Sequence, residues 1–338
     1  MEVPFPEDRK KAVISILSNI DYLSAKIAHD VATQEGIYTL LSSPKSLMEI
    51  AYEKKYQNPE MLGVWLNKLA SFGFLNSEPG SDLFQTPLNF PELPSPHPEN
   101  SFASDLVIWE RMIKQLAEVF PAKLRNEMIG VSFDKNPYIW DSLTSLESAE
   151  TLRELIITQS RITEHIAKKT THGEKFRILD LGGFTGNSTL TLNRLLPENI
   201  EITTVVHSTK YVRAVEATFD VFGITNAEVL KAPPIAPLTA TINKTYDAIF
   251  TFHHETYISL QRIPDLAKLL RPSGSLAGFN PLRDKAGQPL LLEWIWNVIP
   301  FFPKYPMRET FRATLANSGF TSINLQPAPL WTFSAIRR

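Results

Sequence analysis

The sequence contains no cysteine among its 338 residues. This absence excludes a disulfide framework, a thiol nucleophile and a thiolate metal site, although it does not fix the cellular compartment. We therefore expect chemistry that does not use cysteine, and we predict no metal site.

Long apolar runs are also missing. In the C-terminal half, the longest apolar stretch covers 290–302 and is interrupted by Glu293, Asn297 and Pro300, so it is too short and too polar to cross a bilayer. Residues 1–11 lack the apolar core of a signal peptide. We expect a cytoplasmic protein that has no membrane partner.

No charge of one sign dominates the chain. The formal net charge of −2 excludes a generally basic nucleic-acid-binding protein and leaves only local basic patches. Hydrophobic residues make up 43% and charged residues 21%, which is typical of globular proteins. The length suits more than one domain. We predict three parts, covering 1–100, 101–172 and 173–338.

The N-terminal part has the pattern of a mostly helical, winged-helix domain. Apolar residues recur at helical spacing over 14–36, and two further helices are predicted to begin at Ser46 and Asn58, both of which are good N-cap residues. Residues 74–75 and 83–86 flank a turn and are predicted to pair as a short wing. Prolines then mark an extended linker; they are Pro87, Pro91, Pro94, Pro96 and Pro98.

A winged helix raises the alternative of DNA binding. The helix predicted over 59–72 contains a single basic residue, Lys68, which stands among apolar residues that include Trp65. DNA-reading helices need Lys and Arg for phosphate contacts, whereas buried aromatic residues are typical of protein interfaces. We favour packing or homodimerisation for this part, with no nucleic-acid partner. Two helical stretches around 101–125 and 145–169 are predicted to connect it to the C-terminal part.

The C-terminal part alternates strands and helices, which predicts an α/β fold: a mostly parallel, Rossmann-like sheet with helices on both faces. Strands are predicted over 176–181, 200–207, 227–230, 246–252 and 275–279, followed by a hairpin of 322–326 with 331–336. Helices are predicted over 187–196, 210–222, 259–270 and 308–318, with a turn at 271–274.

A glycine-rich turn, 182–186, follows the first of these strands. Glycines allow a tight bend and a close approach of a ligand to the backbone, and the next helix start offers free N–H groups to an anion. Ligands in such sheets bind beyond the carboxyl ends of the strands. On its own the turn also fits a dinucleotide site or a simple connection.

The run 177–186, Arg-Ile-Leu-Asp-Leu-Gly-Gly-Phe-Thr-Gly, closely resembles the first motif of class I S-adenosylmethionine-dependent methyltransferases. Together with the helical N-terminal part and the Phe-His-His-Glu run at 252–255, the chain is similar to the small-molecule O-methyltransferases of plants and bacteria, including the caffeate, hydroxyindole and polyketide types. The similarity extends to the turn at 270–274 and to 316–320.

The resemblance implies S-adenosylmethionine as cofactor and a homodimer. It implies that His254 is the general base that deprotonates an acceptor hydroxyl, with Glu255 beside it, while His253 is structural. The residues implied to surround the cofactor are Asp180, Gly182, Gly183, Phe184, Gly186, His207, Ser208, Phe250 and Phe252. Residues suggested to line the acceptor pocket, although each is more often part of a core, are Trp109, Trp140, Trp294 and Trp296.

Several positions depart from the family pattern. Phe184 replaces a glycine of the loop, and His207 stands where a carboxylate would accept hydrogen bonds from both ribose hydroxyls. Ala232 lies where an acidic residue is expected near the adenine. Phe250 replaces a lysine, and Asn280 replaces the acidic residue that orients the base. The loss of one charged bidentate acceptor weakens binding by about 1.5–3 kcal/mol.

Two hypotheses follow from the resemblance and its departures. The first is methyl transfer from S-adenosylmethionine to a small-molecule secondary metabolite, at a hydroxyl. The second is a repurposed enzyme of the same fold that catalyses cyclisation, rearrangement, elimination or hydroxylation without methyl transfer. A non-catalytic binding protein is a third reading, which the sequence supports least.

Overall fold

The structure is a computed structural model, and the residues it describes are 5–77, 82–92, 102–127, 146–170, 174–181, 184–233, 236–252, 259–284, 292–296 and 305–338. The chain divides into two compact units. The sheet unit comprises Met1–Ile14, Pro137–Leu282 and Pro303–Arg338, and the helical unit comprises Ser15–Asn136 and Arg283–Phe302. The three-part division at residues 100 and 172 stays a prediction.

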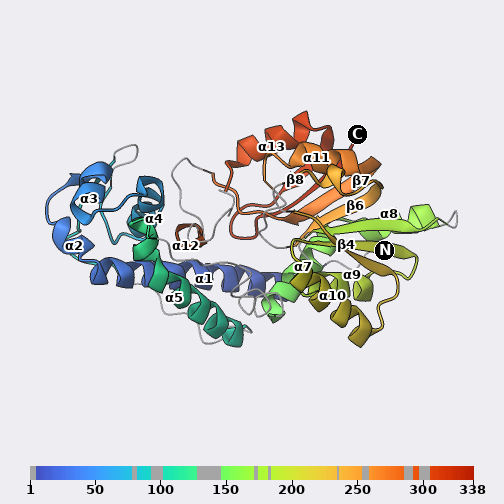
Figure 1. Cartoon of the computed structure of the whole chain (residues 1–338), viewed down its shortest axis with the longest axis horizontal. Coiled ribbons are helices and arrows are strands. Elements are labelled where there is room, and N and C mark those ends of the chain that lie inside the picture. Colours follow the sequence, from blue (N-terminus) through green and yellow to red (C-terminus); the bar gives the residue numbers. More distant parts are fainter. Residues whose placement is uncertain are drawn as a thin grey trace. The chain divides into compact units, whose positions relative to one another are not determined.

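Within the described residues, the sheet unit is built on a seven-stranded sheet of order β5-β4-β3-β6-β7-β9-β8 (Figure 1). Strands β5, β4, β3, β6 and β7 are parallel, and β9 pairs antiparallel with both β7 and β8. The strands are β3 Phe176–Leu181, β4 Ile200–Val206, β5 Ala227–Lys231, β6 Tyr246–Thr251, β7 Leu270–Phe279, β8 Phe320–Leu325 and β9 Thr332–Arg337.

Helices cover both faces of this sheet, with α7, α9 and α10 on one side and α11 and α13 on the other (Figure 1). The central strands β3 and β6 are therefore buried on both faces, and apolar residues form most of each strand. The helices of this unit are α7 Glu147–Gln159, α8 Ile162–Thr170, α9 Asn187–Leu195, α10 Thr209–Phe222, α11 Ile263–Leu269 and α13 Arg308–Asn317, with a 3₁₀ turn at Leu238–Ala240.

The predicted α/β sheet is confirmed. The predicted strand 176–181 matches β3, and α10 ends as predicted at Gly223, which adopts a left-handed conformation with φ of 65°. The turn predicted at 271–274 was wrong, because these residues lie within β7 as a bulge between its pairings with Tyr246 and Ala248. The helix predicted from 259 begins only at Ile263.

The helical unit begins within α1 and confirms two predicted helix starts. Ser46 and Glu49 form a reciprocal capping box at the start of α3, and the Asn58 side chain accepts a hydrogen bond of 3.1 Å from the Met61 N–H at the start of α4. The described elements are α1 Glu7–Gln34, α2 Ile37–Leu40, β1 Lys45–Ser46, α3 Leu47–Lys54, α4 Pro59–Ser71, β2 Leu83–Phe84, α5 Ala103–Leu124 and α12 Glu293–Trp296.

The predicted wing was partly wrong in its pairing. Strand β2 pairs antiparallel with β1, which the sequence analysis had not assigned as a strand. Residues 74–75, the predicted partner of β2, form no strand; directly after them Asn76 forms one bridge with Gln85, in which the two residues exchange backbone hydrogen bonds of 2.7 and 3.0 Å. A two-residue strand such as β1 carries too few residues to show an alternating pattern, so periodicity did not reveal it.

The core of the helical unit holds three aromatic side chains in edge-on contact. The Phe120 ring lies edge-on to Trp65 at 5.1 Å and to Trp294 at 4.9 Å between ring centroids. The Trp294 indole N–H also donates to the Ser24 hydroxyl at 2.7 Å. Trp294 is thus a core residue of this unit, whereas Trp109 is half-buried; Trp140 and the side chain of Trp296 lie outside the described residues.

Lys68, the single basic residue of α4, is buried and forms an ion pair with Asp21 on α1. Burial lowers the pKa of its ammonium group, while Asp21 and Glu293 oppose that shift. A lysine held in this way packs α4 against α1 and does not reach a phosphate, which supports the packing interpretation of this helix.

Among the described residues, no helix combines the length and apolar character that a membrane crossing requires.

Gly278 in β7 is required by the packing of two neighbouring strands. A side-chain Cβ at this position would overlap both the Oγ1 and the carbonyl oxygen of Thr251 on β6. We expect Gly278→Ala to lower the free energy of unfolding by about 3 kcal/mol, measured by urea denaturation, because the backbone of a central strand cannot move aside. Gly223→Ala is the control, since a Cβ there contacts nothing within 4 Å and only its left-handed φ costs about 1 kcal/mol. Equal losses in the two variants would contradict this account.

Candidate active site

The topology of the sheet places a ligand site beyond the carboxyl ends of β3 and β6. From β3 the chain passes to β4 and β5 on one side and then to β6 and β7 on the other, so the strand order reverses between β3 and β6. Ligands in open parallel sheets bind at this reversal. Asp180, Phe250 and Phe252 lie at this edge, whereas Gly182, Gly183, His253, His254 and Glu255 lie outside the described residues.

Asp180 is fully buried near the end of β3. Its Oδ2 accepts hydrogen bonds from the Ser188 hydroxyl at 2.6 Å and the Thr189 hydroxyl at 2.7 Å, both in the first turn of α9. Thr189 in turn contacts the Thr204 hydroxyl on β4 at 2.5 Å. The other carboxyl oxygen, Oδ1, is buried and has no hydrogen-bond partner among the described residues. Asp180 therefore ties the loop and α9 to the sheet and keeps one acceptor for a further donor.

Burial also sets the protonation of Asp180. It raises the pKa of this carboxyl from 3.8 to about 6, although the two hydroxyl donors and the Arg153 guanidinium on α7 oppose the rise. Arg153 is itself buried, its pKa is lowered to about 10, and its Nε donates to Thr191 at 3.1 Å. Sequence reasoning missed Arg153, because only the fold brings α7 close to β3.

The raised pKa of Asp180 predicts a specific pH dependence of stability. The native state holds this proton more tightly than the unfolded chain, so the contribution of Asp180 to stability falls as pH rises from about 4 to about 6, by about 3 kcal/mol. Asp180→Asn should remove that fall, measured as the difference between urea stabilities at pH 4 and pH 7. Asp220→Asn, on the exposed surface of α10, is the control. If the urea stability of wild type and of Asp180→Asn changed by the same amount between pH 4 and pH 7, the raised pKa of Asp180 would be refuted.

The glycine-rich turn ends in a conformation that only glycine adopts readily. Gly186 has a φ of 82°, and a Cβ there would lie 3.1 Å from the Thr218 side chain. The Thr218 hydroxyl on α10 donates to the Thr185 carbonyl oxygen at 2.6 Å, so α10 holds the turn from outside. The turn leads directly into the N-terminus of α9, and the backbone N–H groups and dipole of a helix N-terminus favour a carboxylate or phosphate.

Phe184 turns its ring toward the end of β4. The ring lies 5.6 Å from the His207 imidazole and 5.1 Å from the Tyr211 ring, both edge-on, and His207 and Tyr211 are 5.0 Å apart. Phe184 is only 7% exposed and belongs to an apolar cluster with Val206, Val215, Phe219 and Ile224. Phe184, His207 and Tyr211, here called the aromatic trio, cover the end of β4, where the resemblance places the ribose. Tyr211 was not foreseen, because its role depends on how α10 packs.

The other predicted cofactor residues have clear structural surroundings. Phe250 and Phe252 are buried and stacked on each other, with ring centroids 5.0 Å apart and an interplanar angle of 8°. Phe250 pairs in register with Asp180. Ser208 caps α10 through a weak contact of 3.4 Å from the Tyr211 N–H. Ala232 is buried, and its N–H donates to the Val206 carbonyl oxygen at 2.9 Å. Their predicted contacts with a cofactor stay predictions.

Asn280 follows β7 at the same edge of the sheet. It is 1% exposed, and its backbone N–H donates to the Trp331 carbonyl oxygen at 2.9 Å. Neither its side-chain oxygen nor its side-chain nitrogen has a partner among the described residues. A buried amide without partners costs about 1–3 kcal/mol. No cluster of His, Asp and Glu suited to a metal ion occurs within the described part of the chain.

Comparisons with known proteins identify the fold. No family model and no curated protein matches this chain. Among solved structures, the CurJ carbon methyltransferase is 16% identical with a TM-score of 0.68, covering 98% of this chain and 94% of its own. An O-methyltransferase family 2 protein from Planctomyces limnophilus in complex with apigenin is 14% identical with a TM-score of 0.57, covering 96% and 95%. The CMeT domain of the citrinin polyketide synthase is 13% identical with a TM-score of 0.58, covering 95% and 88%. The chain has the methyltransferase fold that the resemblance predicts.

Proposed function

We propose that the protein is an S-adenosylmethionine-dependent methyltransferase that acts on a small molecule, with a hydroxyl as acceptor. One observation carries the proposal: Asp180, a buried carboxylate with one unpartnered oxygen, lies at the strand reversal directly before a glycine-rich turn. Its position at the carboxyl edge of a parallel sheet, where ligands of such sheets bind, supports the proposal.

The residues at one end of this site fit the amino-acid part of the cofactor. The unpartnered Oδ1 of Asp180 is an acceptor for an N–H donor, and the first turn of α9 offers N–H groups to a carboxylate. The cofactor would approach the backbone closely at three glycines that carry no side chain, Gly182, Gly183 and Gly186. His207, Ser208, Phe250 and Phe252 would border the nucleoside, with Phe184 moving aside. When bound, the cofactor supplies an electrophilic methyl group.

The residues proposed to act on the acceptor follow β6. His254 would accept the proton of the acceptor hydroxyl at an imidazole nitrogen, which makes the oxygen a better nucleophile. Glu255 beside it would stabilise the imidazolium that forms. Asn280 would hold the ring in place through its amide, since a neutral amide both donates and accepts hydrogen bonds. The protein otherwise contributes by aligning oxygen, methyl carbon and sulfur and by excluding water.

A second candidate is a repurposed enzyme of the same fold that catalyses cyclisation, rearrangement, elimination or hydroxylation. The aromatic trio favours it, because Phe184 covers the position of the ribose-binding carboxylate, where His207 stands. In this case His254 and Glu255 would act as an acid–base pair.

Calorimetry followed by mass spectrometry separates the two candidates. We expect S-adenosylhomocysteine to bind the full chain, and an accepted substrate to gain one methylene in mass. Absence of binding at millimolar concentration would end the methyltransferase proposal, and a product isomeric with its substrate would favour the second candidate.

We further propose a cytoplasmic homodimer formed through the helical unit. Exposed apolar side chains of this unit, among them Tyr52, Leu88 and Val107, support this proposal, because apolar and aromatic residues suit protein interfaces. Light scattering on the purified protein should give twice the monomer mass of 38.2 kDa. A monomer at micromolar concentration would contradict it.

A further inference from the structure

Arg153 on α7 carries a buried guanidinium group beside the proposed cofactor site. Its side chain is 3% exposed, and its Nε donates to the Thr191 hydroxyl on α9 at 3.1 Å. That hydroxyl donates in turn to the carbonyl oxygen of Asn187, the first residue of α9, at 2.9 Å. Asp180 holds the same helix start from β3, through the two hydroxyl donors described above. Two buried side chains of opposite charge therefore fix the start of α9, one from a helix and one from the sheet.

The glutamates near Arg153 form ion pairs with other arginines. Glu150 and Glu154 lie on α7, and both pair with Arg194 on α9, with a distance of 2.7 Å between Arg194 and Glu150. Glu154 also pairs with Arg9, in the first turn of α1. The charges of both glutamates act on Arg153 as well. These two carboxylates therefore have cationic partners besides Arg153.

For Asp180, the described residues provide one cation, Arg153. Its charge favours the carboxylate over the protonated acid, against the effect of burial. The other neighbours of Asp180 are neutral: the hydroxyls of Ser188 and Thr189 on α9, and Phe250, which pairs in register on β6. Both charged side chains are buried, so water screens this interaction only weakly. Without the charge of Arg153, Asp180 would stay protonated to a higher pH.

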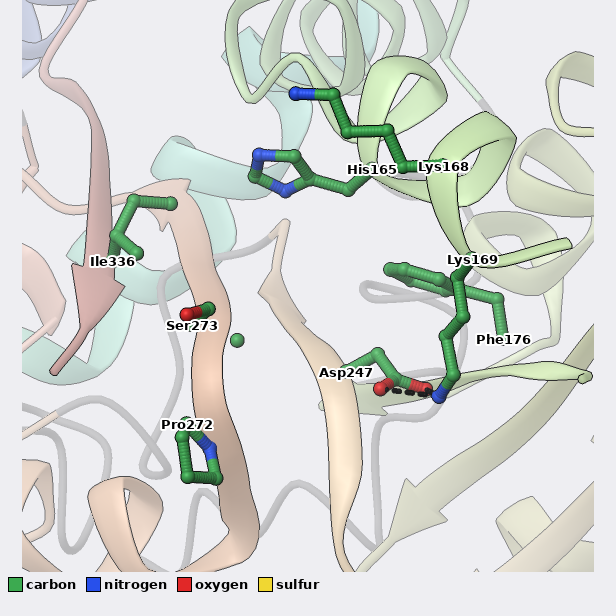
Figure 2. Close-up of a pocket in the computed structure, with 9 residues that line it drawn as sticks. His165, Lys168, Lys169, Phe176, Asp247, Pro272, Ser273 and Ile336 are labelled. Atoms are coloured by element: carbon green, nitrogen blue, oxygen red, sulfur yellow. Dashed lines mark hydrogen bonds and ion pairs between the residues drawn. The ribbon is translucent and has the colours of Figure 1, made fainter. Parts of the chain in front are cut away.

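Asp247, at the opposite edge of the same sheet, shows how a structural carboxylate is held. Both of its oxygens accept from the Lys169 ammonium group at 2.7 Å (Figure 2). They also accept from the Arg177 backbone N–H at 2.8 Å and from Arg271 Nη1 at 3.2 Å. Asp180 differs, because its Oδ1 has no hydrogen-bond partner among the described residues. A carboxylate that is kept charged and keeps one acceptor suits a cationic ligand.

We propose that Arg153 is a positioning residue of the cofactor site: it holds the start of α9 through Thr191, and its charge keeps Asp180 a carboxylate that binds the ammonium group of S-adenosylmethionine. In this role Arg153 acts through Asp180 and α9 and not by contact with the ligand. The identity of the ligand rests on the proposed function, whereas the effect of Arg153 on Asp180 does not.

Calorimetry with S-adenosylhomocysteine between pH 5.5 and pH 8.5 tests this role. Wild-type affinity should rise with pH around about 6, where Asp180 loses its proton. Arg153→Gln removes the charge and keeps an N–H donor, and it should move this midpoint up by about one to two pH units. Binding should then be about tenfold or more weaker at pH 5.5, but within about twofold of wild type at pH 8.5. Arg153→Lys, which keeps the charge, should keep the wild-type midpoint.

Arg194→Met is the matched control, because Arg194 belongs to the same group of ion pairs and its charge is not among those that act on Asp180. It should also keep the wild-type midpoint. Three results would overturn the proposal: the same midpoint in wild type and Arg153→Gln, an equal shift in Arg194→Met, or a loss of affinity in Arg153→Gln that is equal at every pH.

Urea denaturation tests the effect on Asp180 without any ligand. The native pKa of Asp180 lies above its unfolded value, so the stability from this group is lost as pH rises to about 6 in wild type. In Arg153→Gln the loss should continue beyond pH 7, and adding Asp180→Asn should abolish that extension. Arg153→Met is a second neutral variant should Arg153→Gln not fold.

The two measurements separate this inference from the proposed function. If wild type binds no S-adenosylhomocysteine while the loss of stability extends to higher pH as expected, the proposed function fails and the effect of Arg153 on Asp180 stands. If the neutral variants and wild type show the same pH dependence of stability, Arg153 does not set the charge of Asp180, whatever the protein binds.

Discussion

We expect His254→Ala to lower the turnover number for methyl transfer by about 100- to 10,000-fold while the affinity for S-adenosylhomocysteine stays within about twofold. This is the contribution of a positioned general base. The loss should fall on turnover because, in the proposed mechanism, the imidazole acts on the acceptor proton and does not hold the cofactor. Single-turnover kinetics with the natural acceptor, alongside calorimetry with S-adenosylhomocysteine, measure both quantities.

His253→Ala is the matched control, since the adjacent histidine is predicted to be structural. Added imidazole should restore part of the activity of His254→Ala and none of any loss in His253→Ala, because a free base replaces only a missing base. If both variants lose activity equally, or if imidazole restores neither, His254 does not act as the base.

The sequence predicted the sheet well because burial on both faces leaves a direct mark on a strand. The apolar run 176–181 and the glycine after α10 identified β3 and a helix end almost to the residue. In the helical unit, the start of α3 was also predicted correctly, because Ser46 and Glu49 cap this helix through hydrogen bonds to each other. Such signals depend only on neighbours in the chain.

Features that depend on residues far apart in the chain were not predicted. The β7 bulge forms because four residues of β7 lie between two successive pairings where β6 has only one, and a Pro-Ser-Gly sequence looks the same as a turn. The contact of Arg153 with the surroundings of Asp180 requires α7 to pack on the sheet. The aromatic trio requires α10 to bring Tyr211 beside a loop residue 27 positions earlier, which no local pattern encodes.

The aromatic trio bears most directly on whether the cofactor binds. In the structure the Phe184 ring packs against His207 and Tyr211, at the end of β4 where the proposed site would hold the nucleoside. Binding there would require the ring to leave its cluster. Exposing a buried phenylalanine costs about 1.5–3 kcal/mol, which corresponds to roughly a 10- to 100-fold loss of affinity.

Phe184→Ala should therefore raise the affinity for S-adenosylhomocysteine about 10- to 100-fold, measured by calorimetry, even though the loss of the ring lowers the free energy of unfolding. Phe219→Ala is the matched control: Phe219 is also 7% exposed in the same cluster, but it lies on α10 and not in the glycine-rich turn. It should lower stability without raising affinity. Equal affinities in wild type and Phe184→Ala would mean that the ring does not obstruct the nucleoside. Weaker binding in Phe184→Ala would instead make the ring a stacking surface for the cofactor, because aromatic rings attract one another through offset and edge-on contacts.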